Sequence, residues 1–291
     1  MCCETGIESL TLLHGTMGLS CRWWELRRAV CRGGWGQRIG KRGNTVNTTI
    51  EFFDFQAELY DRYQRTCIPQ YEEMLRVAAA VLASSLSGAS APRILDVGCG
   101  TGNTTAVLAK HLPGAVFTLL DGSESMLSAA REKLSGLTND FHRADLQLEG
   151  WAEPWSAETF DGAISVLVLE HLPFEAYRRF LSRLLNVLRP GARLVTVEGY
   201  AGDLNESLFF AEMAQWEERA QSTGAVTRDQ LEKMKRLSAE SEHHFLATMD
   251  EKKSWWIEAG YENVEFVWQY YCVATLTGRK PIGKDSAFTD K

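Results

Sequence analysis

Three glycines within five positions follow an apolar stretch that is typical of a buried strand. They are Gly98, Gly100 and Gly102 in the segment ILDVGCGTGNTT, residues 94–105, and a carboxylate, Asp96, stands two positions before the first of them. Glycines at such a strand-to-helix turn let the backbone approach a ligand closely and present its N–H groups. The turn therefore predicts a ligand-binding loop with an acidic side chain beside it.

Two classes of ligand use a glycine-rich first turn of this kind: dinucleotides and S-adenosylmethionine. Dinucleotide sites have the spacing G-x-G-x-x-G/A. The spacing here is G-x-G-x-G, and Asn103 occupies the place of the third small residue. A carboxylate at Asp96 would repel a pyrophosphate, but it suits the α-ammonium and the sulfonium of S-adenosylmethionine. We therefore favour S-adenosylmethionine and keep a dinucleotide as the alternative.

Two further acids follow the next two expected strands. Asp121 ends the strand over 115–121 and is placed to accept both hydroxyls of a ribose, a group that both ligand classes contain. Asp145 ends a short strand over 141–145, where it can accept from an adenine amino group while Leu146 covers the ring. The predicted site therefore extends across the carboxyl ends of neighbouring strands.

The elements that must position these residues alternate between strands and helices. Expected strands cover 93–97, 115–121, 141–145, 161–168 and 192–198, and expected helices between them cover 103–112, 124–134 and 174–188. This alternation predicts a parallel, doubly wound α/β sheet. Helices are also expected over 47–87, in an insert over about 203–247, and from a capping box at Thr248 and Glu251 to Gly260; two strands over 262–280 follow as a hairpin.

Five segments resemble, in order, the successive motifs of the class I S-adenosylmethionine-dependent methyltransferases. They are ILDVGCGTG, LLDGSESML, RADL, FDGAISVLVLEHL and LRPGARLVTVE, and they span about 93–198. The resemblance implies a Rossmann-like, seven-stranded sheet of order 3-2-1-4-5-7-6, and methyl transfer from S-adenosylmethionine to a small-molecule acceptor by in-line displacement. A looser likeness is to carboxy-S-adenosylmethionine synthase, in which an aromatic of a P-x-Y helix and a nearby Arg help enclose the cofactor; Tyr71 and Arg65 match those positions.

The predicted cofactor site draws on the loop, the strands beside it and the N-terminal helices. Its expected residues are Asp96, Gly98, Cys99, Gly100, Gly102, Asp121, Gly122, Met126, Asp145, Leu146, Val166, Tyr60, Arg65 and Tyr71. His171, just after the fourth strand, is the candidate general base, with a helix cap or a surface position as the alternative. His243 and His244 are adjacent and would point apart on a helix, so no metal site is expected, although one of them could face the cleft.

The insert carries an apolar face with two open interpretations. The residues of this face either cover an apolar pocket or pack the insert onto the core; they are Phe209, Phe210, Met213 and Trp216. Arg219 and Arg228 could bind an acidic substrate, but solvated charge is the favoured interpretation.

Charge and cysteine content divide the chain. We expect a basic leader over 1–46, one methyltransferase domain over 47–280 and a tail over 281–291. The domain would comprise lid helices (47–92), the cofactor-binding core (93–200), the helical insert (201–250), and a closing helix and hairpin (251–280). The first 45 residues carry seven basic and three acidic side chains, whereas the whole chain has a net charge of −7. The leader is thus compatible with a transit peptide, a disordered extension or a wrongly chosen start.

The acidic body argues against nucleic acid as a partner, and no stretch of 18 apolar residues predicts a membrane span. Seven cysteines without a CxxC motif indicate neither a disulfide framework nor a zinc site, and favour a cytoplasmic location. The oligomeric state stays open. Two other functions also stay open: cofactor remodelling of the carboxy-S-adenosylmethionine synthase kind, which needs an Arg such as Arg65 or Arg219 aimed at the sulfonium, and S-adenosylmethionine binding without catalysis.

Overall fold

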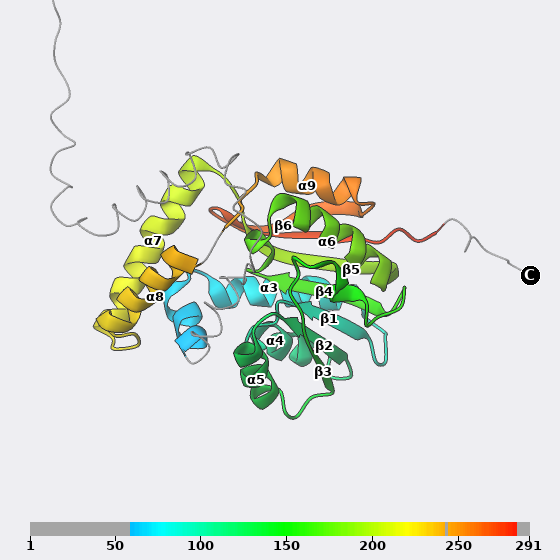
Figure 1. The fold of residues 1–291 in the computed structure, drawn as a ribbon, viewed down its shortest axis with the longest axis horizontal. Helices are drawn as coiled ribbons and strands as arrows, with labels where there is room; N and C mark the ends of the chain where they lie inside the picture. Colours follow the sequence, from blue (N-terminus) through cyan, green and yellow to red (C-terminus); the bar gives the residue numbers. More distant parts are fainter. Residues whose placement is uncertain (1–58, 242–243, 284–291) are drawn as a thin grey trace, which may run out of the picture. The chain divides into compact units, whose positions relative to one another are not determined.

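The computed structural model describes residues 59–241 and 244–283, without the side chains of 237–241. The expected leader, the beginning of the lid helices, His243 and most of the tail lie outside these residues. In the part that is described, a central sheet has helices on both faces (Figure 1).

Seven strands form one sheet of order β3-β2-β1-β4-β5-β7-β6. They are β1 (Arg93–Val97), β2 (Val116–Asp121), β3 (Asn139–Arg143), β4 (Phe160–Val166), β5 (Leu188–Gly199), β6 (Glu262–Tyr270) and β7 (Val273–Arg279). The first five strands are parallel, and β7 runs antiparallel to both of its neighbours. The predicted order and the closing hairpin are confirmed.

Alternation of side chains along the buried strands builds two apolar layers. Ile94 of β1 packs with α3 (Tyr71–Ser84), α4 (Asn103–His111) and α5 (Glu124–Lys133). The next residue, Leu95, packs on the other face with α6 (Phe174–Val187) and α9 (Met249–Glu258). The sheet is therefore doubly wound, and its loops at the carboxyl ends of the strands are held between two fixed layers.

The bounds of β3, β4 and β5 differ by two or more residues from the sequence interpretation; β4 ends at Val166, two residues before the expected end. β3 ends at Arg143, two residues before Asp145, because the Asp145 carboxylate and carbonyl accept the N–H groups of Gln147 and Leu148 in a turn. β5 begins at Leu188, earlier than expected, and its register against β4 shifts after Phe160. This irregularity accommodates Pro190 and Gly191 inside the strand.

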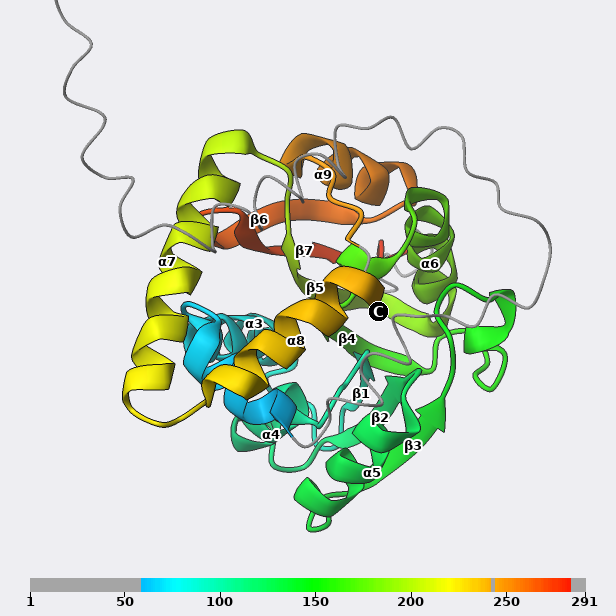
Figure 2. The same cartoon turned by 60° about the vertical axis from the view of Figure 1, so that its left-hand side comes forward.

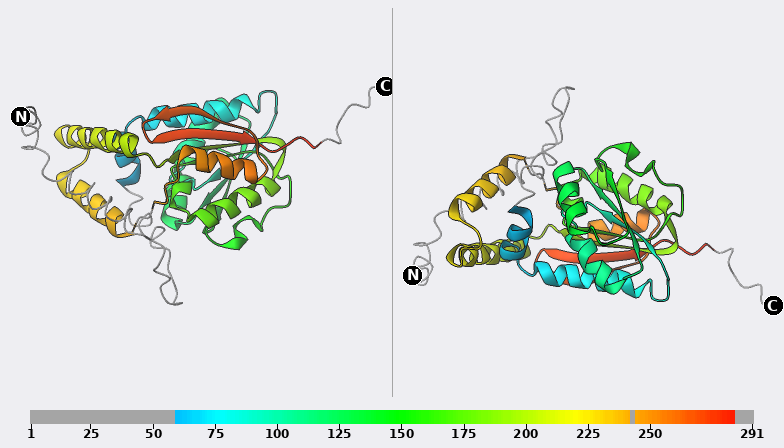
Figure 3. Two further views of the ribbon diagram at one scale, coloured as in Figure 1. Left: turned by 90° about the horizontal axis from the view of Figure 1, so that it is seen from above. Right: turned by 90° about the horizontal axis from the view of Figure 1, so that it is seen from below.

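The expected insert after β5 contains two helices, α7 (Asp203–Ser222) and α8 (Arg228–Ser241), which are joined at one end by a turn and diverge from there (Figures 2 and 3). Phe209 is buried, and Phe210 and Met213 pack beside it against the same cluster as α3, which agrees with the packing interpretation of this face. Arg219 lies over the Trp216 ring, 5.7 Å from its centroid.

The capping box is confirmed at the start of α9. The Glu251 N–H donates to the Thr248 hydroxyl, and the Thr248 N–H donates to the Glu251 carboxylate at 2.8 Å. No helix within 59–241 and 244–283 has the length and low charge that crossing a bilayer requires.

Candidate active site

The three loop glycines all have positive φ, and they serve different purposes. A Cβ on Gly98 would lie 2.4 Å from the Val168 side chain, and one on Gly102 would lie 2.7 Å from Leu134. These two glycines allow close packing. A Cβ on Gly100 would meet only the Tyr60 ring, at 3.7 Å. Gly100 is therefore the glycine whose missing side chain leaves room for a ligand.

Asp121, the last residue of β2, is joined to this loop. The Gly100 N–H donates to one carboxylate oxygen of Asp121 at 2.8 Å, and the Ser123 N–H donates to the other at 2.9 Å. Each carboxylate oxygen has more than one acceptor position, so these bonds leave capacity for a ligand hydroxyl. The arrangement holds an acidic acceptor at the carboxyl end of the strand beside the glycine loop.

A cavity of about 640 Å³, including its open mouth, lies against Gly100 and Asp121. The predicted residues that line it are Tyr60, Gly98, Gly100, Asp121, Gly122, Met126, Asp145, Leu146 and His171. The structure thus brings the candidate base into the same cavity as most of the predicted cofactor residues.

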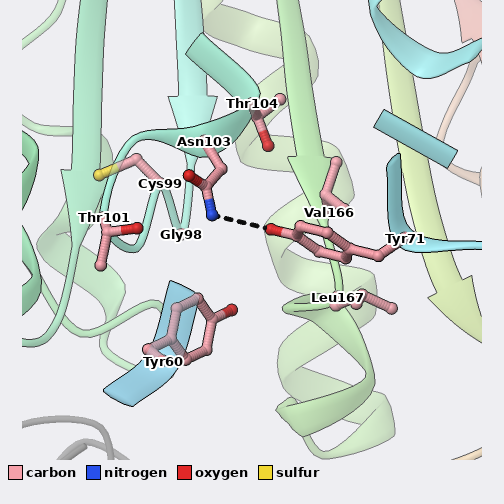
Figure 4. Close-up of a pocket in the computed structure, with 9 residues that line it drawn as sticks. All are labelled: Tyr60, Tyr71, Gly98, Cys99, Thr101, Asn103, Thr104, Val166 and Leu167. Atoms are coloured by element: carbon pink, nitrogen blue, oxygen red, sulfur yellow. Dashed lines mark hydrogen bonds between the residues drawn. The ribbon is translucent and has the colours of Figure 1, made fainter. Parts of the chain in front are cut away.

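A smaller cavity shares Tyr60, Gly98 and Leu167 with the first and is also lined by Tyr71, Cys99 and Val166. Figure 4 shows Tyr71 from α3 pointing toward the loop, where the Asn103 side-chain amide donates to its hydroxyl at 3.1 Å. Burial raises the pKa of Tyr71 to about 12. Tyr71 is therefore a neutral wall of the site near neutral pH.

Three predicted residues line neither of these cavities: Asp96, Gly102 and Arg65. Asp96 is buried on the α4 side of the sheet, where it accepts from the Thr105 hydroxyl at 2.6 Å. Strand alternation directs it there, and a contact between Asp96 and the ammonium group of the cofactor stays a prediction. Arg65 instead forms an ion pair with Glu72.

His171 lies in the short 3₁₀ helix Leu169–His171 (η2) at the carboxyl end of β4, and it stacks on a second histidine. The ring centroids of His171 and His244 are 4.6 Å apart, with planes inclined by 37°. His244 lies in a non-helical segment, and not on a helix as expected, because the Phe245 N–H donates to the Glu170 carbonyl at 2.6 Å. This backbone bond brings the two imidazoles together.

Glu170, next to His171, has only 4% of its surface exposed, and its Oε2 has no hydrogen-bond partner among the described residues. Burial raises its pKa to about 7, partly offset by its attraction to His171. The nearby Glu198 also raises this pKa, and Lys252 lowers it. The base candidate therefore lies beside a carboxyl group that is poised between its neutral and charged forms.

This buried carboxyl predicts a pH-dependent stability. Because the pKa rises from 4.5 in the unfolded chain to about 7 in the folded one, the folded state retains the proton longer. The contribution of this raised pKa to the free energy of unfolding is complete below pH 4.5 and is lost as the pH rises through 7. The total loss is about 3 kcal/mol. The side chain introduced by Glu170→Gln cannot ionise. Between pH 5 and 8, the free energy of unfolding of this variant should therefore rise relative to that of the wild type by up to about 3 kcal/mol.

Urea unfolding of both proteins at each pH measures this difference. Both proteins contain the other titrating groups, such as Asp96, so the contributions of those groups cancel when the two free energies are subtracted. Glu153→Gln, at an exposed position, is the control and should track the wild type throughout. A gap between Glu170→Gln and the wild type that stays constant from pH 5 to 8 would contradict the assignment.

The cavity lining also contains residues that the sequence interpretation missed. Gln147 follows the turn after β3, and Leu167, Val168 and Leu172 follow β4. Their position at the carboxyl ends of strands was the available signal. No cluster of three or more metal-ligating side chains occurs in the described part of the chain.

The lining indicates which ligand fits. It contains the carboxylates of Asp121 and Asp145, and neither described cavity includes a Lys or Arg side chain. Such a surface suits a ligand with hydroxyls, an amine and a cationic centre, and would repel a pyrophosphate. The residues present therefore fit S-adenosylmethionine better than a dinucleotide.

Comparisons with known proteins agree with this geometry. Residues 94–191 match the methyltransferase domain family. The chain is 33% identical over 184 residues to a trans-aconitate 2-methyltransferase of Rhodopseudomonas palustris (strain BisA53), covering 62% of this chain and 64% of that protein. It is 31% identical over 146 residues to a demethylmenaquinone methyltransferase of Clavibacter sepedonicus, covering 50% and 56%.

The match to these curated relatives covers less than two thirds of their length. Among solved structures, an O-methyltransferase family protein from Burkholderia thailandensis superposes with a TM-score of 0.59 at 15% identity, over 91% of this chain and 70% of that one. This similarity shows a shared fold. With the strand order and the glycine loop, the matched residues 94–191 form a domain similar to the class I S-adenosylmethionine-dependent methyltransferases.

Proposed function

We propose that this protein transfers a methyl group from S-adenosylmethionine to a small molecule whose acceptor atom gives up a proton to His171. The observation that carries the proposal is a single cavity. It contains the Asp121 carboxylate, joined to the Gly100 N–H at 2.8 Å, and the candidate base His171. The proposed cofactor site and the proposed proton acceptor thus line the same cavity.

The cofactor, when bound, supplies a methyl group that its sulfonium already activates. The residues of the chain would do the positioning. Asp121 would accept the ribose hydroxyls, Asp145 the adenine amino group, and Gly100 would admit the ligand against the backbone. Tyr60, which lines both cavities, would exclude water from the reacting atoms.

His171 would remove a proton from the acceptor as the acceptor is methylated. The stacked His244 fixes the orientation of its ring. The Glu170 carboxyl would influence the charge of the His171 imidazole, because an ionised Glu170 attracts the protonated imidazole. We therefore assign His171 as the base, and Glu170 and His244 as residues that position and tune it.

The proposed acceptor is a hydroxyl-bearing molecule that is neutral or weakly acidic. The relatives include enzymes named for trans-aconitate, a polycarboxylate, and for demethylmenaquinone, a quinone. Neither described cavity presents Lys or Arg to a carboxylate, and both carboxylates of the larger one would repel a polyanion. An acceptor with an ionisable hydroxyl matches the histidine pair.

Cofactor remodelling is not favoured, because it needs an Arg directed at the sulfonium. Arg65 is paired with Glu72, and Arg219 lies over Trp216. Neither side chain lines the described cavities.

Calorimetric titration of the full chain with S-adenosylmethionine and, separately, with NADH tests the cofactor part of the proposal. Binding of the first alone is expected. A screen of phenols, enols and aliphatic hydroxyl compounds with methyl-labelled cofactor then tests the transfer. Binding of NADH, or of neither ligand, would overturn the proposal. Cofactor binding without transfer to any acceptor would favour a non-catalytic protein.

His171→Asn is expected to lower kcat about 100-fold on the acceptor that the screen identifies, because proton removal by a positioned base contributes at least that factor. The affinity for S-adenosylmethionine should change little. The rate deficit should shrink as the pH approaches the pKa of the acceptor, which then ionises without help. An equal rate loss at every pH would assign His171 a packing role instead.

A further inference from the structure

Residues 59–67 form a helix that contacts the glycine loop through one face (Figure 2). The Asp61 carboxylate accepts hydrogen bonds from three side chains: the Thr101 hydroxyl, the Asn103 amide at 3.0 Å and the Lys133 ammonium. Lys133 in turn donates to the Thr101 hydroxyl at 2.9 Å and to the Asn103 carbonyl oxygen at 2.7 Å. We call these four side chains the loop latch.

The loop latch places Tyr60 over the cofactor cavity. Tyr60 precedes Asp61, lines both cavities, and has its ring 3.7 Å from where a Gly100 Cβ would be. Burial by itself would raise the pKa of Asp61, but the bonds from Lys133 and Thr101 outweigh it and lower the pKa. The carboxylate therefore stays charged, and the ion pair to Lys133 persists, at neutral pH.

Other residues of the same helix contact the insert. Tyr63 and Cys67 are four residues apart, so they lie on one side of the helix. They pack in a separate apolar cluster with Ala220 of α7 and Leu231 of α8, and Cys67 is fully buried there. The helix thus lies between the cofactor loop and the insert, with different residues facing each.

The insert in turn reaches the candidate base. α7 and α8 are joined by an ion pair between Glu217 and Lys235, so they form one unit. The chain that leaves α8 carries His244, which stacks on His171, and Phe245, whose N–H donates to Glu170. A continuous series of contacts therefore connects the glycine loop, helix 59–67, the insert and the acceptor side of the cavity.

We propose that helix 59–67 couples cofactor binding to ordering of the α7–α8 insert, and that Asp61 and Lys133 are the positioning residues that transmit this coupling. A cofactor bound beneath Tyr60 would stabilise the contact of helix 59–67 with the glycine loop. The helix would in turn stabilise the insert in its position on the acceptor side of the cavity. The protein would then favour an acceptor after the cofactor. The inference rests on the proposed function for the ligand that occupies the cavity.

Hydrogen exchange of the full chain, followed by mass spectrometry with and without saturating S-adenosylhomocysteine, tests the coupling without any acceptor. In the wild type, the ligand should slow exchange in the loop over 98–103 and also in the insert over 217–235. In Lys133→Met, at ligand saturation, protection of the loop should persist, while protection of the insert should fall about five-fold or more. Dissociation of the ligand should become about ten-fold faster.

Asp61→Asn removes the latch from its other side and should reproduce both effects. Lys110→Met, at an exposed position of α4, is the matched control and should behave as the wild type. A thermal melt of each variant checks that it is folded. Protection of the loop alone in the wild type, or full insert protection in Lys133→Met, overturns the coupling and leaves the proposed function standing. No protection of the wild-type loop overturns both.

Discussion

Asp121→Ala is expected to lower the affinity for S-adenosylmethionine about 1,000-fold. The carboxylate accepts the N–H groups of Gly100 and Ser123, at 2.8 and 2.9 Å, and so fixes the loop on which the cofactor would lie. In the proposed complex it would also accept the ribose hydroxyls. Hydrogen bonds to a charged group contribute about 1.5–3 kcal/mol each, and the loss of two of them corresponds to roughly this factor. Calorimetric titration measures it.

Two variants separate loss of the contact from loss of the fold. Asp121→Asn keeps one carbonyl acceptor and should bind more tightly than Asp121→Ala, though more weakly than the wild type. Asp140→Ala, on the exposed side of β3, should bind normally. Wild-type affinity in Asp121→Ala would place the cofactor elsewhere and would remove the basis for assigning His171 to the reacting side of the cavity.

The fold could be predicted from the sequence to a large extent, because local signals agreed with one another. The β1 boundaries, Arg93 to Val97, match the expected strand, since an apolar run of that length before a glycine turn has few other solutions. The capping box at Thr248 and Glu251 set the start of α9 for the same reason. The strand order followed from the resemblance, because nothing in local periodicity specifies which strands are neighbours.

The cofactor site was predictable where a residue's position at a strand end determines its direction. Asp121, the last residue of β2, lies in the cavity for this reason, and Asp145 lines it from the turn after β3. Asp96 is placed differently. It precedes the loop in sequence, but alternation along β1 directs its side chain to Thr105 beneath the sheet surface. Sequence proximity to a ligand loop is therefore a weaker guide than the parity of the residue in its strand.

Contacts between distant elements could not be predicted. The loop latch joins Asp61 to Lys133 across 72 positions, and each residue alone is an ordinary charge on a helix surface. The contact between the His171 and His244 rings depends on a backbone bond from Phe245 to Glu170, which places an expected helical residue in a non-helical segment. Such features depend on tertiary packing, which propensity and periodicity do not encode.

Beneath the histidines, a buried ion pair joins the sheet to its α6–α9 layer. Lys252 and Glu198 are 1% and 0% exposed, and the ammonium donates to the carboxylate. Glu198 also accepts from the Tyr177 hydroxyl at 3.0 Å, and that hydroxyl accepts from the Trp256 indole N–H at 2.9 Å. The ammonium lies 5.0 Å from the ring centroids of Tyr177 and Tyr200.

Lys252→Met is expected to destabilise the protein by about 3–5 kcal/mol, because it leaves the Glu198 carboxylate buried without its cation. Urea unfolding measures the loss. Lys253→Met, one position along α9 and half-buried, is the control and should lose far less.

The double variant Glu198→Gln with Lys252→Met decides whether the single loss arises from charge or from packing. Removing both charges leaves no buried ion, so most of the lost stability should return. A packing defect from the shorter apolar side chain would persist in the double variant. Because Lys252 also lowers the pKa of Glu170, and Glu198 raises it, the same variants should shift the titration that Glu170→Gln detects. The buried pair would then act on the charge state of the carboxyl beside His171.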